Sequence, residues 1–146
     1  MLNQLSKIKV AAAAVLLPFM LSLCVCARAQ QTPEQLAQQS AESWLALVDS
    51  GKYAESWQEA SSLFKAHVSK DEWQKMMHAT CDPLGKMISR KLKSATYAKT
   101  LPGAPDGDYV VIQYETRFEH KQSAVETITP MLDTDGHWRV SGYFIK

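Results

Sequence analysis

The stretch from residue 109 to residue 145 most constrains what this chain can fold into, because its pattern is typical of three consecutive β-strands. Residues 109–119 (YVVIQYETRFE) alternate between two sides and are rich in β-branched and aromatic side chains, as half-buried strands are. Residues 123–132 and 138–145 follow after short turns, the second of which contains Asp135-Gly136. Since Gly adopts the positive φ of a tight hairpin turn, we expect an antiparallel meander.

Two-residue loops at 120–121 and 135–136 fix the predicted register of these strands. One face then collects most of the large apolar side chains, mixed with threonine and glycine: Val110, Ile112, Tyr114, Thr116, Phe118, Val125, Thr127, Thr129, Met131, Val140, Gly142 and Phe144. This face contains no aspartate or glutamate, so we expect it to be the core face. A slip by one residue would turn every side chain of a strand to the other face.

The residues before the meander predict short amphipathic helices. Residues 32–35 (TPEQ) and 69–72 (SKDE) have the capping-box pattern of helix starts, and a further helix is expected over residues 53–64. Residues 86–99 place several lysines among apolar positions and indicate an edge strand. The expected fold class is therefore α+β, with three N-terminal helices packed on a curved, cone-like antiparallel sheet of about four strands.

Residues 1–29 differ in composition from the rest of the chain. Lys7 and Lys9 precede an apolar run from Val10 to Cys26, and Ala27-Arg28-Ala29 matches the cleavage pattern of a secretory signal peptide. An uncleaved membrane anchor is the alternative, which the short apolar run disfavours. We expect a signal peptide at 1–29, one domain at 30–146, a periplasmic or secreted location, and no stable membrane anchoring after cleavage.

Charge and motifs argue against several function classes. With 16 basic and 15 acidic residues the net charge is +1, so no nucleic-acid partner is expected. His120 and His137 belong to turns at opposite ends of the meander, and Cys81 is the only cysteine after residue 26, so no metal site is expected. The familiar nucleophile, phosphate-binding and dinucleotide motifs do not occur, so neither a cofactor nor catalytic residues are assigned.

The predicted core face contains small residues between large ones, opposite tryptophans of the helices. The residues concerned are Tyr114, Thr127, Thr129, Gly142, Trp44 and Trp57. Such an arrangement forms either a ligand pocket or a socket that a helix tryptophan fills, and the sequence leaves both open. As a pocket it would hold a small amphipathic molecule.

The other face of the predicted sheet also keeps apolar side chains. Val111, Ile128 and Tyr143 neighbour one another there in the predicted register. Since exposed aliphatic groups on a sheet often mark an interface, we expect them to support a homodimer. Trp138 is expected to be structural and to close one end of the core.

Three segments resemble one family of small exported bacterial proteins: Glu42–Trp57 (ESWLALVDSGKYAESW), Leu101–Glu115 (LPGAPDGDYVVIQYE) and Val125–Lys146 (VETITPMLDTDGHWRVSGYFIK). The family is catalogued as domain of unknown function four thousand and nineteen, and the resemblance implies no activity and no site residues. More loosely, helices followed by a sheet ending in Asp-Gly-His-Trp-Arg-Val resemble the cone-shaped nuclear-transport-factor-2-like fold. That fold holds isomerases, dehydratases and non-enzymatic binding modules, so it does not choose a function.

The function we expect is that of an exported, non-enzymatic binding or interaction module. The alternative is a small isomerase- or dehydratase-like enzyme. Such an enzyme needs a carboxylate or histidine with a shifted pKa in an apolar pocket. Because the predicted core face of the sheet carries none, the base would have to come from the helices: Glu42, Glu55, Glu59 or Glu72.

Overall fold

The structure of the protein is a computed structural model that describes residues 30–146, so the expected signal peptide lies outside the described residues. The elements in chain order are helices α1 (Pro33–Asp49), α2 (Tyr53–Gln58), α3 (Ser62–His67) and α4 (Lys70–Cys81), the 3-10 turn η1 (Asp82–Leu84), and strands β1 (Met87–Ala98), β2 (Tyr109–Phe118), β3 (Lys121–Leu132) and β4 (Trp138–Ile145).

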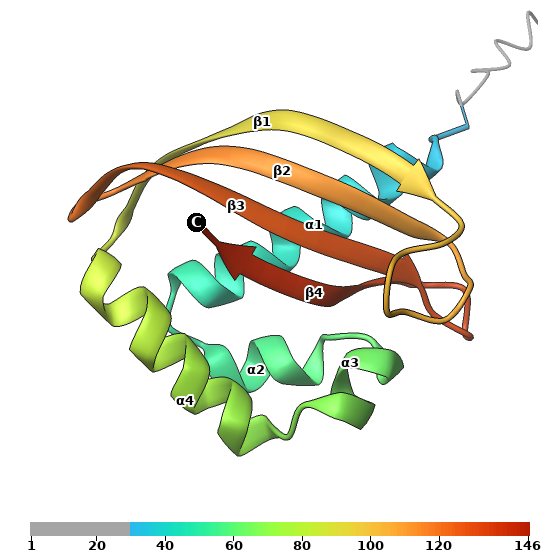
Figure 1. Cartoon of the computed structure of the whole chain (residues 1–146), viewed down its shortest axis with the longest axis horizontal. Helices are drawn as coiled ribbons and strands as arrows, with labels where there is room; N and C mark the ends of the chain where they lie inside the picture. The colour runs from blue at the N-terminus through green and yellow to red at the C-terminus, as the bar shows by residue number, and fades with distance from the viewer. Residues whose placement is uncertain (1–29) are drawn as a thin grey trace, which may run out of the picture.

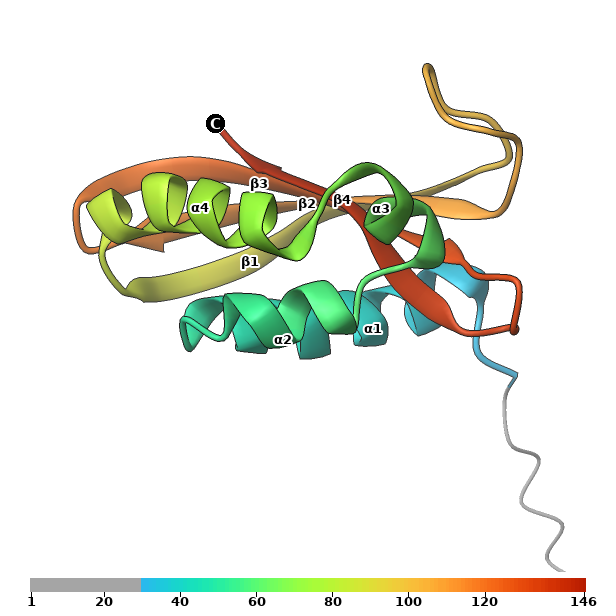
Figure 2. The same ribbon diagram turned by 90° about the horizontal axis from the view of Figure 1, so that it is seen from below.

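The strands form one open antiparallel sheet in the order β1-β2-β3-β4, and β1 is an edge strand as expected. The helices gather on one side of the curved sheet (Figure 1), and the view from below shows α2 beside α1 (Figure 2). Helix α1 contacts all four strands. The expected α+β class, with helices on a four-stranded antiparallel sheet, is therefore confirmed.

Local sequence signals explain where the helices begin. The Thr32 and Ser69 side chains accept hydrogen bonds from the backbone N–H groups of Gln35 and Glu72, and both capping boxes are complete. The helix expected over residues 53–64 is divided into α2 and α3. The division follows from Ser61, whose side chain caps a new helix by accepting from the Phe64 N–H at 3.1 Å.

The register of the β2–β3 hairpin differs from the predicted one. The two turn residues are Glu119 and His120, so that Phe118 pairs with Lys121, and a bulge then adds one residue to β3. The net shift is one residue along most of the hairpin, and Tyr114 pairs with Glu126 where Thr127 was expected. A shift of one residue turns over every side chain of β3 relative to β2.

The β3–β4 hairpin follows the predicted register over part of its length. Thr129 pairs with Gly142, and Thr127 pairs with Phe144, as expected. An irregularity next to Thr129 changes the pairing toward the turn, where Val140 lies opposite a different residue of β3 from the one expected. The predicted pairing is therefore correct from Thr127 to Thr129 and wrong by one residue toward the turn.

These shifts decide which side chains enter the core. The face of the sheet toward the helices, called here the inner face, carries Ile112, Ile128 and Val140, which are buried with the apolar stripe of α1. Thr127, Thr129, Gly142 and Phe144 lie on the other, outer face, and Phe144 is 50% exposed. The expectation of an acid-free core face is wrong, because Glu126 enters the inner face and is fully buried.

Candidate functional site

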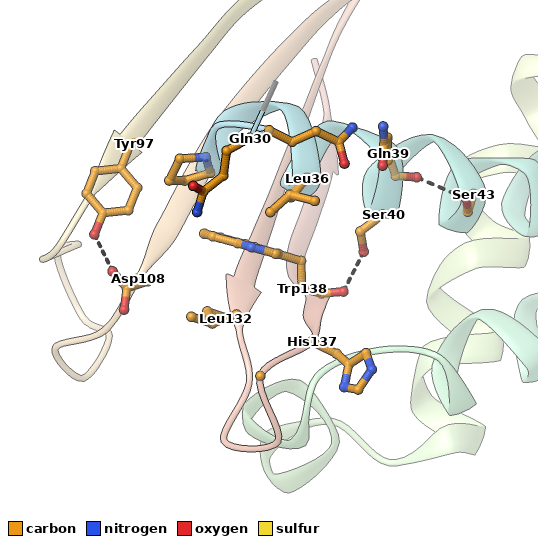
Figure 3. A pocket seen from close by; sticks show the side chains of 13 residues that line it. Gln30, Leu36, Gln39, Ser40, Ser43, Tyr97, Asp108, Leu132, His137 and Trp138 are labelled. Carbon is orange, nitrogen blue, oxygen red and sulfur yellow. Dashed lines mark hydrogen bonds between the residues drawn. The ribbon is translucent and has the colours of Figure 1, made fainter. Parts of the chain in front are cut away.

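A cavity of about 680 Å³ opens where the start of α1 meets the start of β4 (Figure 3). Its lining also includes side chains from the end of β1, the residue before β2 and the β3–β4 turn. Apolar side chains such as Leu36 and Leu132 occur there together with amides and hydroxyls. Both the volume and this mixed lining are in the range of small-molecule sites.

One side of α1 forms a wall of the cavity. Pro33, Leu36, Ser40 and Ser43 follow one another at steps of three or four residues, so they share one face of the helix. A neighbouring stripe of α1 is buried in the core and fixes the position of the helix: Ala37, Ala41, Trp44, Leu45 and Val48. The wall is therefore built on a rigid element.

Trp138 is the aromatic side chain at the centre of this cavity. It is the first residue of β4, and its ring lies between Leu36 and Leu132 (Figure 3). The Ser40 hydroxyl donates to the Trp138 carbonyl at 2.7 Å, which ties the start of β4 to α1. The side chain is partly buried and packs against the core.

The indole N–H of Trp138 is distinguished by its hydrogen bonding. Trp44, Trp57 and Trp73 donate their Nε1–H groups to Ser56 O, Val68 O and Ser56 Oγ, at 2.7, 2.8 and 2.9 Å. Within residues 30–146, Trp138 Nε1 has no such partner. Since this atom is not among the buried polar atoms without a partner, the N–H is open to solvent at the cavity and available to a ligand there.

On the far wall of the cavity, the Asp108 carboxylate is paired with other side chains of the protein. The Tyr97 hydroxyl donates to the Asp108 carboxylate, and Lys99 Nζ lies 2.6 Å from the same oxygen. The hydrogen bonds from Lys99 and then Tyr97 hold the pKa of Asp108 below its usual range. Asp108 is therefore an ionised acceptor and not a proton donor near neutral pH.

A second polar cluster lies in the core, away from this cavity. Glu126 accepts from Arg90 Nε at 2.6 Å and Nη2 at 3.0 Å, from the Tyr143 hydroxyl at 2.6 Å, and from the Thr116 hydroxyl. Arg90 also binds Asp49 through two further hydrogen bonds, at 2.7 and 2.9 Å. The Glu126 carboxylate is thus fully paired and inaccessible, which suits a structural role better than acid–base catalysis.

Two further titratable groups are poorly suited to chemistry. Burial, and then the charge of Glu42, raise the pKa of Tyr114 to about 12, and its buried hydroxyl has no hydrogen-bond partner among the described residues. Burial raises the pKa of the Cys81 thiol to about 11, so this thiol stays protonated and is a weak nucleophile. Neither group is a proton acceptor near neutral pH.

The six residues of the predicted pocket are not brought together. Tyr114 points to the inner face, whereas Thr127, Thr129 and Gly142 belong to the outer face, because the register of β3 is shifted. Trp44 is 3% exposed and packs at 5.3 Å, centroid to centroid, from Tyr143. None of the six residues lines this cavity, although Trp44 lines a smaller neighbouring cavity that shares Trp138 with it.

The predicted interface is corrected in the same way. Ile128 and Tyr143 are neighbours as expected, because they pair across β3 and β4, but both belong to the inner face, where Ile128 is fully buried. Val111 alone remains on the outer face. The homodimer stays a prediction, without the surface that was assigned to it.

The cavity residues Leu36, Tyr97 and Asp108 were not identified from the sequence, and Trp138 was assigned a structural role only. One signal could have found Leu36, since its helical position lies at the margin of the apolar stripe of α1, and in the structure it is 38% exposed. Asp108 and Tyr97 carry no comparable signal, because only the folded sheet places them beside α1.

Two further findings concern the described residues. No helix in the described part of the chain has the length and apolar composition needed to cross a bilayer. Across residues 30–146 no three His, Cys, Asp or Glu side chains are grouped as a metal site would require.

Comparison with known proteins identifies a family. A family model described as "Protein of unknown function (DUF4019)" matches residues 40–143, which include most of α1, all the other helices and nearly all of the sheet. No curated protein matches the chain significantly. The matched range contains Ser40, Ser43, Tyr97, Asp108 and Trp138 of the cavity.

Proposed function

The chain belongs to this family of proteins of unknown function, and because the family assigns no activity, we propose from the geometry that it is a non-enzymatic binding module. The proposed site is the cavity between α1 and the start of β4. The proposed ligand is a small amphipathic molecule with an apolar part and at least one hydrogen-bond acceptor.

The observation that carries the proposal is the position of Trp138. Its ring lies in a cavity of about 680 Å³, and its N–H has no acceptor in residues 30–146. Leu36 and Leu132 supply apolar contact, and Asp108 supplies an ionised acceptor. A ligand acceptor opposite Trp138 Nε1 would satisfy the one indole donor that the fold leaves open.

Three observations favour binding over the alternative of a small enzyme. The Asp108 carboxyl at the cavity has a pKa that is lowered by Lys99 and Tyr97, whereas a general acid or base near neutral pH needs a raised one. Glu126 is fully buried in the core, where its carboxylate accepts four hydrogen bonds. Glu72, one of the helix carboxylates considered, serves the capping box of α4.

We place this function outside the cytoplasm. The support comes from residues 1–29, whose Lys7 and Lys9, apolar run and Ala27-Arg28-Ala29 have the order of a secretory signal. An exported module that retains a ligand would serve as a carrier or sensor in that compartment.

The test is a screen of the purified protein against amphipathic metabolites, followed by thermal shift, tryptophan fluorescence and product analysis. A hit should be retained without turnover. Trp138→Phe, which keeps an aromatic ring but removes the N–H and part of the apolar surface of the indole, should weaken that hit at least about tenfold, as expected for one lost hydrogen bond together with lost contact.

The control is Trp57→Phe, which removes an indole N–H that donates to Val68 O, away from the cavity. This variant should lose thermal stability but keep the affinity of the wild type. The proposal is wrong if no compound binds, or if a bound compound is converted to product by the wild type.

A further inference from the structure

A second cavity adjoins the cavity at Trp138 along α1. The second cavity has a volume of about 240 Å³ and shares Ser40, Ser43, His137 and Trp138 with the first. It extends the lining to Leu47 on α1 and to Glu59 beyond α2. The two together form a groove, called here the α1 groove.

The lining of the α1 groove extends along most of helix α1. Its helix wall runs from Pro33 to Leu47, and the rise of about 1.5 Å per residue makes this wall roughly 20 Å long. The wall residues are spaced at three or four positions along the helix, so the groove follows the helix axis. A ligand that fills it must be an extended chain.

The charges in the α1 groove are largely compensated by the protein itself. Asp108 is paired with Lys99 at 2.6 Å, and Arg139 is paired with Asp135 through two hydrogen bonds, at 2.7 and 2.9 Å. Glu59, at the far end, is the one carboxylate of the groove that forms no salt bridge within residues 30–146. An extended ligand that is largely uncharged is therefore complementary to this surface.

The uncharged polar groups of the groove both donate and accept. Gln30, Gln31 and Gln39 contribute amides, and Trp138 contributes the open N–H. Ser40 and Ser43 contribute hydroxyl oxygens that can accept, because their O–H groups already donate to the Trp138 and Gln39 carbonyls. Leu36, Leu47 and the Trp138 ring add apolar surface between them. This composition suits a chain whose units carry many hydroxyls and also have apolar C–H faces.

An extended peptide fits the groove less well. Peptides that bind beside a sheet add a strand to a free edge and use its backbone groups. On the edge of β4 next to the groove, the Trp138 carbonyl accepts from Ser40 Oγ at 2.7 Å, and the Val140 carbonyl accepts from Ser61 N at 2.8 Å. These acceptors are already used, so the groove offers side chains rather than a backbone ladder.

From the length, the compensated charge and the side-chain donors and acceptors, we propose that the α1 groove binds a neutral oligosaccharide in an extended conformation. This inference rests on the proposed function, because it names the class of ligand for the same site. It adds that the binding site continues past Ser43 toward Leu47 and Glu59.

The experiment measures binding to the purified protein by titration calorimetry. The probes are three neutral hexasaccharides, namely cellohexaose, maltohexaose and the hexamer of N-acetylglucosamine, each with its disaccharide. Anionic hexagalacturonate and a mixed library of neutral decapeptides are the comparators. At least one neutral hexasaccharide should bind at least tenfold more tightly than its disaccharide and than hexagalacturonate.

Two variants on α1 test whether the bound hexasaccharide lies along the α1 groove. Ser43 is exposed and lines both cavities, so Ser43→Trp should block the groove at its middle and reduce the hexasaccharide affinity to that of the disaccharide. Ala46 is exposed on the same helix and lines neither cavity, so Ala46→Trp should leave the affinity unchanged.

The outcomes separate this inference from the proposed function. If no neutral oligosaccharide binds, but an amphipathic compound does and loses affinity in Trp138→Phe, the saccharide inference is overturned and the binding function stands. If neither class binds, both are overturned. Hexasaccharide binding that Ser43→Trp leaves intact, or tighter binding of the decapeptides, also overturns the inference.

Discussion

Arg90 and Glu126 join β1 and β3 across the inner face of the sheet through two hydrogen bonds, at 2.6 and 3.0 Å. Glu126 is fully buried, and the Arg90 side chain is only 12% exposed. Arg90 also binds Asp49 at the end of α1, so one guanidinium links the first helix to the sheet.

Arg90→Met should therefore be strongly destabilising. The variant leaves a buried carboxylate without its cation, which typically costs about 3–5 kcal/mol in the free energy of unfolding. The midpoint of urea denaturation measures the effect. Arg117→Met is the control, because Arg117 is exposed and makes one long hydrogen bond to Gln122, and it should stay within about 0.5 kcal/mol of the wild type. Equal midpoints for the two variants would contradict the structural role of Arg90.

The lowered pKa of Asp133 leads us to expect that the protein loses stability in acid. Burial alone would raise its pKa, but hydrogen bonds from Ser62 and Thr134 and the charge of Arg139 lower it. A carboxyl with a lowered pKa stabilises the fold above its unfolded pKa, and this stabilisation disappears as the pH falls through the folded pKa. The contribution of Asp133 should therefore be complete near pH 7 and decline below about pH 4.

Asp133→Asn tests this directly. The variant should lose on the order of 1–2 kcal/mol at pH 7, since hydrogen bonds to a charged acceptor are stronger than neutral ones. Its difference from the wild type in urea denaturation should shrink as the pH is lowered toward 2. Asp106→Asn, in the exposed β1–β2 loop, is the matched variant and should show no comparable loss at pH 7. A difference for Asp133→Asn that is constant with pH would refute the assignment.

Ile128→Lys and Phe144→Lys distinguish the two faces of the sheet. Ile128 is fully buried on the inner face, so a lysine there places an unpaired charge in the core and should abolish cooperative unfolding. Phe144 is half exposed on the outer face, and its change to lysine should keep the fold. Circular dichroism with thermal unfolding measures both. A folded Ile128→Lys protein would mean that β3 has the register expected from the sequence.

Trp44 and Trp138 should differ in how much each contributes to the free energy of unfolding. Trp44 is 3% exposed and donates to Ser56 O, so Trp44→Ala should cost about 3–5 kcal/mol. Trp138 is only partly buried at the cavity, and Trp138→Ala should cost clearly less. Urea midpoints of the two variants, measured side by side, decide the order. The reverse order would make Trp138 mainly a core residue.

The mature protein is expected to begin at Gln30, because Ala27 and Ala29 occupy the small-residue positions of a signal cleavage site. The intact mass of the exported protein measures the start of the chain. A membrane-bound form that keeps residues 1–29 would show that the segment is an anchor.

The elements that could be predicted are those with local signals. The capping boxes at Thr32 and Ser69, the alternation of β2 and the Asp135-Gly136 turn are each coded within a few residues. The fold class followed from them. The register of β3 against β2 could not be predicted in this way. The sequence near His120 does not distinguish a turn at Glu119-His120 from one shifted by a residue.

The candidate site was predictable only in part for a related reason. Leu36, Tyr97 and Trp138 are far apart in the sequence, and they meet because α1 crosses the sheet near the start of β4. Glu126 shows the same limit in the core. The predicted register left Glu126 off the core face, and only the folded positions of Arg90, Thr116 and Tyr143 make its burial possible.

The bulge in the β2–β3 hairpin has a consequence for how this chain tolerates changes in length. Because side chains alternate along a strand, deleting one residue between His120 and Ala124 would bring Thr127 to the inner face and expel Glu126 from its partners. The β1–β2 loop, residues 99–108, is not subject to this parity and can vary in length with less harm. Among natural and engineered variants, insertions and deletions should therefore be common in the loop and absent from the hairpin.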